Sequence, residues 1–528
     1  MENPLEHKIL KNHRLGIIFI GSALSTGLLV GSGFGLARSG PAGILLNYSI
    51  IGFVAFLVLS ALGEMSSFAP MLTGAGGYAS RFVDPALGFA TGYCNALKYL
   101  LSTPNHLVAA SLIMKFWVGD TVKSSAIVTV ALIVVLIINL ITLKAFGEFQ
   151  FWLALLKMTL LCGTIVLMLI VALGGGPNRD RLGFRYWKNP GAFADFDVSG
   201  PRGRFYRAWS TMVHAAYAFG GTELVGVPVT ERKNPRTAMA GAVRLTFLRI
   251  FSIFILSIFL LGMVVPYDTP KLAFASSSHT TAAASPFVAA VELANIKGLD
   301  HVINGLMLIF ITATSTTDFF LATRTIYGIA LDGKAPAILT RTNSRGTPVL
   351  VVVIPFLFSL LAYLSMSSNT QTVFSYLMEM IVGFSVLTWI SILTTHIAFC
   401  RAVKIQNIPS DRFAYRAPFR EWGSMVALVF LCIFNLGKGS ELFTGKKFNY
   451  RIFIVQYIGI PFYLLCVFGY KIHQGTRRVR SMEADLSTGV STIPYDEEKA
   501  RKKEEDRIKL ANATGLKRVY RRFLSWIF

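Results

Sequence analysis

The chain has 528 residues, of which 53% are hydrophobic and 15% are charged, and its mean hydropathy is +0.55. This composition is too apolar for a soluble protein, and the length accommodates about a dozen membrane spans, since a helix crosses the bilayer core with about 20 residues. The net charge of +23 resembles that of nucleic-acid-binding proteins, but most basic residues flank apolar segments and no nucleic-acid motif accompanies them. We therefore expect no nucleic acid partner, and assign the charge to orientation in a bilayer with anionic lipid.

The first apolar segment, residues 15–37, follows a short basic stretch, 1–14, that we expect to stay in the cytoplasm. Its middle is crowded with glycine and serine, and each interior glycine weakens a helix by about 1 kcal/mol relative to alanine. We predict a break near Ser25, Thr26 and Gly27. Broken backbone inside a membrane exposes N–H groups that can bind an anion and carbonyl groups that can bind a cation, and an amino acid zwitterion carries both charges.

The first half of the chain contains four further predicted spans, at 43–62, 87–118, 126–143 and 151–173. The third span contains His106. The fifth contains Lys157, about one and a half turns from its cytoplasmic end and too deep to dismiss at once as a flanking charge. Residues 174–207 form a long polar loop that the span count places outside, although its basic charge opposes the positive-inside rule.

The sixth span, 208–229, repeats the features of the first: a glycine pair in its middle is followed by Glu223 and Pro228. Two glycine-interrupted spans that each open a group of five are typical of inverted-repeat transporters. Close packing of small residues between helices would explain one such segment, but it explains less well the charged residue beside the second. Six more spans are predicted, at 245–265, 302–329, 349–366, 373–399, 425–436 and 452–470.

These elements predict an all-α polytopic membrane protein with about twelve transmembrane helices. The expected divisions are a short cytoplasmic N-terminus (1–14), a first repeat (15–173), an extracellular loop (174–207), a second repeat (208–399), two extra helices (400–470) and a cytoplasmic tail (471–528). The tail ends in mixed basic and aromatic residues, which suit binding to the inner leaflet; a solvated terminus is the alternative. The five cysteines lack paired spacing and read as small core residues, so we expect neither a disulfide framework nor a metal site.

Several stretches resemble the fungal amino acid permease family of the amino acid, polyamine and organocation transporters. They are STGLLVGSG in the first span, GEM and SRFVDPALGFATGY around the second loop, TELVGVPVTERKNPR after the sixth-span break, SPFV, IALDGKAP and TTHIAF. The resemblance extends from about Asn12 to the end of the twelfth span. It implies five-plus-five inverted repeats with two extra helices, and amino acid uptake at the plasma membrane, usually driven by protons.

Carried over by position, the resemblance implies that backbone around Ser25, Thr26 and Gly27 holds the substrate carboxylate. It implies that unwound carbonyls take the amino group in the stretch of Tyr217, Ala218, Phe219, Gly220, Gly221 and Thr222. Tyr217 or Phe219 would lie over the substrate as an aromatic gate, or would fill the bundle core. Glu223 would carry the coupled proton, or would bond to the loosened backbone.

Three further polar residues have two interpretations each. Lys157 matches a lysine that resembles a substitute for sodium, and snorkelling to the inner interface is the alternative. His106 stands where the family often has a glutamate; it is either a proton carrier or a neutral histidine with a carbonyl partner. Asp318 is an intramembrane acid that the family's pattern lacks. It either faces the cavity and selects a cationic or polar substrate, or pairs with Arg324.

The sequence thus predicts a plasma-membrane amino acid importer, coupled to protons and working by alternating access, with both termini cytoplasmic. We expect no cofactor and no enzymatic activity, because no nucleophile-and-base set or phosphate loop is present. The expected partners are an amino acid, a proton, the bilayer and, at the tail, the inner leaflet or trafficking machinery. Two alternatives remain open: an amino acid sensor without flux, and an importer of a polyamine, choline or 4-aminobutyrate.

Overall fold

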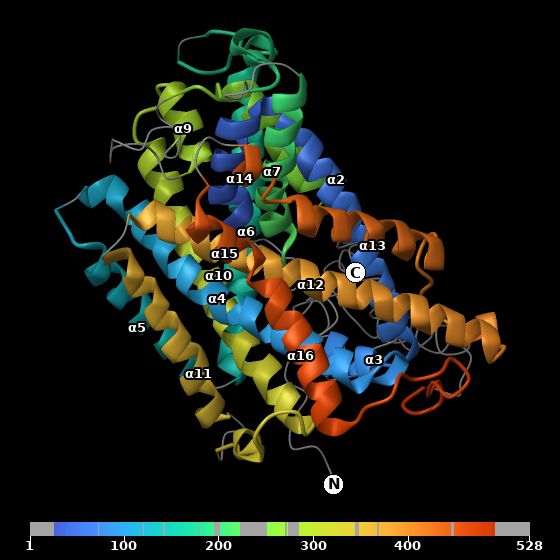
Figure 1. The fold of residues 1–528 in the computed structure, drawn as a ribbon. Coiled ribbons are helices and arrows are strands. Elements are labelled where there is room, and N and C mark those ends of the chain that lie inside the picture. Colours follow the sequence, from blue (N-terminus) through green and yellow to red (C-terminus); the bar gives the residue numbers. More distant parts are fainter. Residues whose placement is uncertain are drawn as a thin grey trace, which may run out of the picture.

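The structure is a computed structural model, and long helices dominate it (Figure 1). It describes residues 26–490 apart from 72, 120, 141–142, 178, 195–200, 222–250, 270–271, 273–284, 344–347, 367–368 and 445–447. The chain is an all-α polytopic membrane protein, as predicted. Within the described residues, six helices are long and apolar enough to cross a membrane, or seven if the bent pair at the end of the chain counts as one span.

The first described element is η1 (Gly27–Gly31), a turn of π-helix that continues directly into α2 (Ser32–Phe68). Inside α2, Gly40 has φ 75° and ψ 172°, a conformation that glycine adopts without steric cost. A Cβ atom at Gly40 would lie 2.8 Å from the carbonyl oxygen of Ala192, which also accepts a hydrogen bond from the Ala42 N–H. The bend at Gly40 therefore separates the end of the first predicted span from the second.

The centre of the bundle is α4 (Pro85–Val118), which packs along both α10 (Leu299–Leu331) and α12 (Thr370–Ile405). Beside them, α7 (Pro201–Phe219) packs along α2. The helix α4 begins where the Asp84 carboxylate accepts the Ala86 N–H, with proline at its first position, and both features favour a helix start. The predicted site residues that the structure describes lie on η1 (Gly27), α4 (His106), α6 (Leu143–Ala172; Lys157), α7 (Tyr217) and α10 (Asp318).

The outer helices present apolar side chains on their exposed faces. Along α13 (Arg420–Gly437) the exposed residues are three or four positions apart and so form one stripe: Trp422, Val426, Val429, Ile433 and Leu436. In water such an exposed apolar stripe would promote aggregation, whereas in a bilayer it is the lipid-facing surface. In Figure 1, α5 (Ser124–Leu140) and α11 (Val349–Ser359) lie at one edge of the bundle and α13 lies at the opposite edge.

The remaining described elements complete the bundle. They are α3 (Gly74–Phe82), α6 (Leu143–Ala172), η2 (Trp187–Gly191), a helix at Phe251–Val264, α9 (Pro286–Leu293), η4 (Ala337–Thr340), η5 (Leu360–Met366), η6 (Ser410–Arg412), α14 (Glu441–Thr444), α15 (Tyr450–Tyr457) and α16 (Gly459–Gln474). The last two are bent by 41° and coincide with the predicted twelfth span.

Several helices extend beyond the apolar stretches that predicted them. The helix α7 begins at Pro201, inside the expected loop 174–207, and α6 begins at Leu143 rather than at residue 151. Hydropathy locates the part of a helix in lipid but does not register the polar turns that continue it outside. Cys162 and Cys432 are exposed on outer helices, so these two are not the core residues that we expected. Twelve spans and the inverted repeat stay predictions.

After α16 the chain returns along α3 and the end of α12. The Val479 N–H donates to the Val83 carbonyl at 2.8 Å, the Arg81 Nε donates to the Asp485 carbonyl at 2.6 Å, and the Gln406 side chain donates to the Ala484 carbonyl at 2.8 Å. This strap, residues 476–490, anchors the tail to the bundle end that carries α3 (Figure 1). The rest of the tail lies outside the described residues.

Asp84 links α4 to the C-terminal end of α16 and to the strap that follows it. It accepts hydrogen bonds from the Lys471 ammonium at 2.7 Å and from the Thr476 hydroxyl at 2.9 Å. Burial of the carboxyl group opposes ionisation, but the bonds from Lys471, the Ala86 N–H and Thr476 outweigh it and lower the pKa of Asp84 below its ordinary value. The ionised form therefore stabilises the fold, and this contribution is present above the pKa of the unfolded state and is lost as pH falls through the folded pKa.

Asp84→Asn should lower the thermal stability of the purified protein at pH 7. Asparagine keeps an oxygen for the helix cap but loses the ion pair with Lys471, which is partly exposed and worth about 0.5–1 kcal/mol. The difference from wild type should shrink below about pH 4, where an unfolded aspartate takes up its proton. Asp180→Asn, which breaks an exposed pair with Arg185, is the control and should leave the melting temperature unchanged. An equal effect of Asp84→Asn at pH 7 and at pH 3.5 would contradict this account.

Candidate functional site

The two glycine-rich stretches that the sequence singled out lie in contact. η1 packs against α7, and a Cβ atom at Gly27 would lie 2.5 Å from the Cα of Ala218 and 2.9 Å from the carbonyl carbon of Tyr217. Real Cβ atoms do not approach backbone so closely, so the contact requires glycine. Thr26 and Gly27 therefore lie directly beside Tyr217 and Ala218, although almost 200 residues separate them in the chain.

The helix α7 ends at the glycine pair. Phe219 is its last residue, the Gly220 N–H bonds to the Tyr217 carbonyl at 3.3 Å, and Gly221 has φ 111°. We expected the unwound stretch to begin at Tyr217, but Tyr217, Ala218 and Phe219 are helical, because it is the glycines that end the helix. Ser25, Thr222 and Glu223 lie outside the described residues.

The hydroxyl group of Tyr217 joins three elements. It lies 2.8 Å from the Thr26 hydroxyl, accepts a hydrogen bond from the Asn105 side chain at 2.9 Å, and lies 3.5 Å from Nε2 of His106. All four side chains are buried. Tyr217 thereby connects η1, α4 and α7 through one polar network. Phe219 instead packs against Phe254, with ring centroids 5.0 Å apart, so of the two proposed gate residues it is Tyr217 that belongs to this network.

A small polar cavity lies beside this network, where α4, α10, α12 and the end of α7 converge. It is lined by Lys98, Tyr99, Ser102, His106, Tyr217, Gly220, Gly221, Thr314, Asp318 and Ile381. A second cavity, between α6, α9 and the helix at Phe251–Val264, is lined almost entirely by apolar side chains. Of these two, the first offers charged and polar groups to a zwitterion.

His106 and Asp318 are in contact where they line the polar cavity. Nδ1 of His106 lies 3.3 Å from Oδ2 of Asp318, which places an acid on α10 against a histidine on α4. Lys157 is buried, its ammonium lies 4.9 Å from the centre of the Phe310 ring, and it interacts electrostatically with both residues. Snorkelling would instead carry the ammonium to the membrane interface, whereas here it is buried inside the bundle. The Arg324 guanidinium lies over the ring of Phe320.

Sequence reasoning passed over Lys98. Its side chain is 2% exposed, and its ammonium lies 3.4 Å from the Tyr99 hydroxyl and over the Tyr99 ring. A lysine within the apolar 87–118 segment carries the same signal that drew attention to Lys157, because intramembrane charges are costly and usually functional. Asn105 was also given no role, since nothing in the sequence indicates that it meets Tyr217.

Comparison with known proteins identifies the family to which this fold and site belong. The family model described as "Amino acid permease" matches residues 15–482. The chain belongs to the amino acid permease family. Permeases are membrane transporters rather than enzymes, and the chain is accordingly a multi-pass membrane transport protein.

Fungal relatives align along nearly the whole chain. The dicarboxylic amino acid permease of Saccharomyces cerevisiae is 39% identical, over 100% of this chain and 87% of its own length. The general amino-acid permease GAP1 of the same yeast is 32% identical, over 94% and 82%. The proline-specific permease of Emericella nidulans is 32% identical, over 93% and 90%. The resemblance seen in the sequence is thus confirmed.

Solved structures of the manganese transporter of Eremococcus coleocola share the fold. One of its mutant forms superimposes with a TM-score of 0.58 at 13% identity, covering 90% of this chain and 96% of that one. At this level of identity the likeness concerns the arrangement of helices alone.

Proposed function

We propose that this permease imports amino acids across the plasma membrane by proton-coupled alternating access, with both termini cytoplasmic and with acidic amino acids as its preferred substrates. The observation that carries the proposal is the contact of η1 with the interrupted end of α7 beside a polar cavity. Membership of the permease family supports amino acid import. Coupling, access mechanism and substrate class are our own extensions.

The substrate's two charged groups match the predicted break in the first span and the glycine pair that ends α7. In this proposal the carboxylate binds to backbone N–H groups from Ser25 to Gly27. The amino group binds to carbonyls at the C-terminal end of α7, from Tyr217 to Thr222, where the helix dipole favours a cation. Tyr217 closes over the substrate, since its ring lines the cavity and its hydroxyl reaches Thr26. Rocking of η1 and α7 against the other helices then exposes the site to each side in turn.

In this proposal, Asp318, Glu223 and His106 take part in proton coupling. Asp318 lies 3.3 Å from His106 and interacts electrostatically with the buried Lys157, so uptake or loss of one proton changes the charge balance of the whole group. Glu223 is the second proposed carrier. Lys157 takes the place of a sodium ion, so sodium is not the driving ion.

The preference for acidic side chains rests on the cavity and on one relative. Lys98 lines the cavity and can pair with a second carboxylate on the substrate, whereas Asp318 already lies 3.3 Å from Nδ1 of His106. The relative at 39% identity is named a dicarboxylic amino acid permease. Both observations favour aspartate and glutamate over polyamines or choline.

Uptake of labelled glutamate into yeast cells that lack their own amino acid permeases tests the proposal. Expression should give uptake that a protonophore abolishes, that replacement of sodium leaves unchanged, and that unlabelled aspartate inhibits more strongly than asparagine. Sodium-dependent uptake would contradict the coupling. Inhibition by proline or by a polyamine, but not by aspartate, would contradict the substrate class. Glutamate binding without flux in proteoliposomes would indicate a sensor.

A further inference from the structure

Three polar side chains share the hydroxyl group of Tyr217, which has one hydrogen and two lone pairs. The Asn105 side chain donates to it at 2.9 Å and so occupies one lone pair. The Thr26 hydroxyl lies 2.8 Å away, and Nε2 of His106 lies 3.5 Å away. With one lone pair and one hydrogen left, Tyr217 accepts from one of these two groups and donates to the other. The two hydrogen bonds therefore run in opposite directions, and reversing one reverses the other.

The orientation of the His106 ring fixes which nitrogen faces Tyr217. Nδ1 lies 3.3 Å from Oδ2 of Asp318 and has no other partner among the described residues, so these two atoms share one hydrogen. A further proton on the ring binds to Nε2. The hydrogen between Nδ1 and Oδ2 then moves to the carboxylate, and His106 and Asp318 are both uncharged. A buried location favours this uncharged form.

The groups around this pair allow it to change state. Asp318 faces His106 from α10 and Tyr217 faces it from α7, while Lys157 on α6 interacts electrostatically with both His106 and Asp318. Lys98, on the same helix as His106, lines the same cavity. The ammonium group of Lys157 favours the ionised form of Asp318, and burial favours the protonated form. Because these effects oppose each other, the pair can take up and release a proton.

The hydrogen on Nε2 sets the direction of the hydrogen bond at η1. Without it, Tyr217 donates to His106, and the Thr26 hydroxyl uses its own hydrogen on Tyr217. With it, His106 donates to Tyr217, and Tyr217 turns its hydrogen to Thr26. The hydrogen of Thr26 is then released for another acceptor. This change requires rotation of two hydroxyl hydrogens and no movement of a helix.

We propose that this relay couples the proton to the substrate: a proton taken up by His106 and Asp318 turns the Thr26 hydroxyl toward the substrate carboxylate. The relay rests on the proposed function, which places that carboxylate beside Thr26. A hydrogen bond to a carboxylate is stronger than one to a neutral oxygen, so the protonated protein binds the substrate more tightly. By thermodynamic linkage, the substrate raises the affinity for the proton by the same factor. Asn105 is a positioning residue, because its bond excludes the state in which both neighbours donate to Tyr217.

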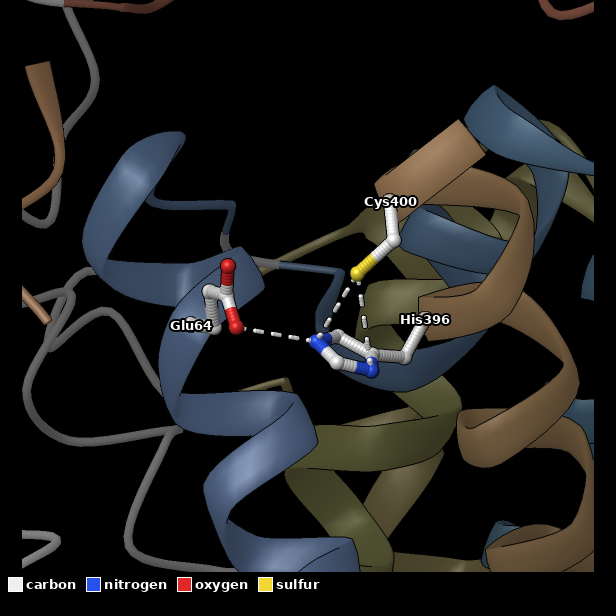
Figure 2. A group of neighbouring side chains, drawn as sticks. All are labelled: Glu64, His396 and Cys400. Carbon is white, nitrogen blue, oxygen red and sulfur yellow. Dashed lines mark hydrogen bonds and ion pairs between the residues drawn. The ribbon is translucent and has the colours of Figure 1, made fainter. Parts of the chain in front are cut away.

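The other two buried histidines that the structure describes lack such a relay. Nδ1 of His214 lies 3.2 Å from the Thr211 carbonyl, one turn earlier in its own helix. Nδ1 of His396 lies 2.8 Å from the Ser424 hydroxyl and its Nε2 lies 3.1 Å from Oε2 of Glu64, which the ring faces in Figure 2. Neither histidine lines the polar cavity, and none of these bonds leads to η1.

Binding of labelled glutamate to the purified full-length protein at pH 5.5 and at pH 7.5 tests the relay. Protein in detergent has no proton gradient, so the affinity reports coupling and not driving force. Wild type should bind about five- to tenfold more tightly at pH 5.5. Glutamate is almost fully ionised at both pH values, since its side-chain carboxyl group has an ordinary pKa of about 4.3.

Asn105→Leu should still bind glutamate, but the difference between the two pH values should fall below about twofold, because Tyr217 then accepts from Thr26 in both states. Tyr217→Phe, which removes the hydroxyl, should also lose the difference, and it serves if Asn105→Leu does not fold by size-exclusion chromatography. Tyr48→Phe is the matched control and should keep the full difference. The buried Tyr48 hydroxyl donates to the Gly27 carbonyl at 3.3 Å and so contacts the same turn of η1, but outside the relay.

A wild-type affinity that is equal at both pH values, in a protein whose uptake a protonophore abolishes, would overturn the relay and leave the proposed coupling in place. A full pH difference that survives in Asn105→Leu and in Tyr217→Phe would also overturn it. Uptake that a protonophore does not affect would instead contradict the proposed function.

Discussion

Gly27→Ala should reduce amino acid uptake by at least about tenfold, because the added methyl group meets backbone rather than flexible side chain. Its carbon would lie 2.5 Å from the Cα and 2.6 Å from the N of Ala218. Overpacking a close contact costs about 1–3 kcal/mol, and the least costly relief is separation of η1 from α7. That separation also moves the Thr26 hydroxyl away from Tyr217. Initial uptake rates, corrected for the amount of protein at the cell surface, measure the effect.

Gly31→Ala is the matched control, because it changes the same residue type in the same turn of π-helix. The nearest atom to its new methyl group is Cδ1 of Tyr217 at 3.6 Å, an ordinary van der Waals contact. Uptake should stay within about twofold of wild type. Equal losses in both variants would mean that glycine at position 27 matters for helix flexibility and not for the contact with α7.

The helices were predictable because long apolar segments dominate their sequences. The predicted spans at 87–118, 302–329 and 349–366 correspond to α4, α10, and α11 with η5. Their polar ends were not predictable from hydropathy. The early start of α7 illustrates this: its first residue is Pro201, which suits a helix start, and its first turn is too rich in arginine for a hydropathy window to include it.

The site was predictable in outline, since glycine within an apolar span is a local signal. The sequence identified Gly27, Gly220 and Gly221 as points of weakness, and the structure brings η1 and α7 together. It could not indicate that Tyr217 would meet Asn105, because a tertiary hydrogen bond leaves no periodic pattern in either segment. The same holds for the motifs GEM and TTHIAF, whose Glu64 and His396 are neighbours only after folding.

Asp318→Asn should abolish proton-driven accumulation of the substrate while leaving substrate exchange measurable. The amide keeps the size of the carboxylate but can neither carry a proton nor balance the charge of the buried Lys157. Removing one partner from a buried charged group typically costs about 3–5 kcal/mol, so net uptake should fall by more than about tenfold. Exchange of labelled for unlabelled substrate in preloaded proteoliposomes requires no net proton movement. It should therefore survive if Asp318 acts in coupling and not only in folding.

Asp332→Asn is the control that shows whether removing any carboxylate from α10 has the same effect. Asp332 caps the same helix, pairs with Lys334 at 2.9 Å and is partly exposed. Its loss should change uptake by no more than about twofold, because partly exposed ion pairs contribute about 1 kcal/mol or less. Uptake by the Asp318 variant that still rises as external pH falls would assign the coupled proton elsewhere, with Glu223 as the other proposed carrier. Loss of exchange together with uptake would instead make Asp318 part of the binding site, because an interaction needed only for coupling cannot be required when no proton crosses the membrane.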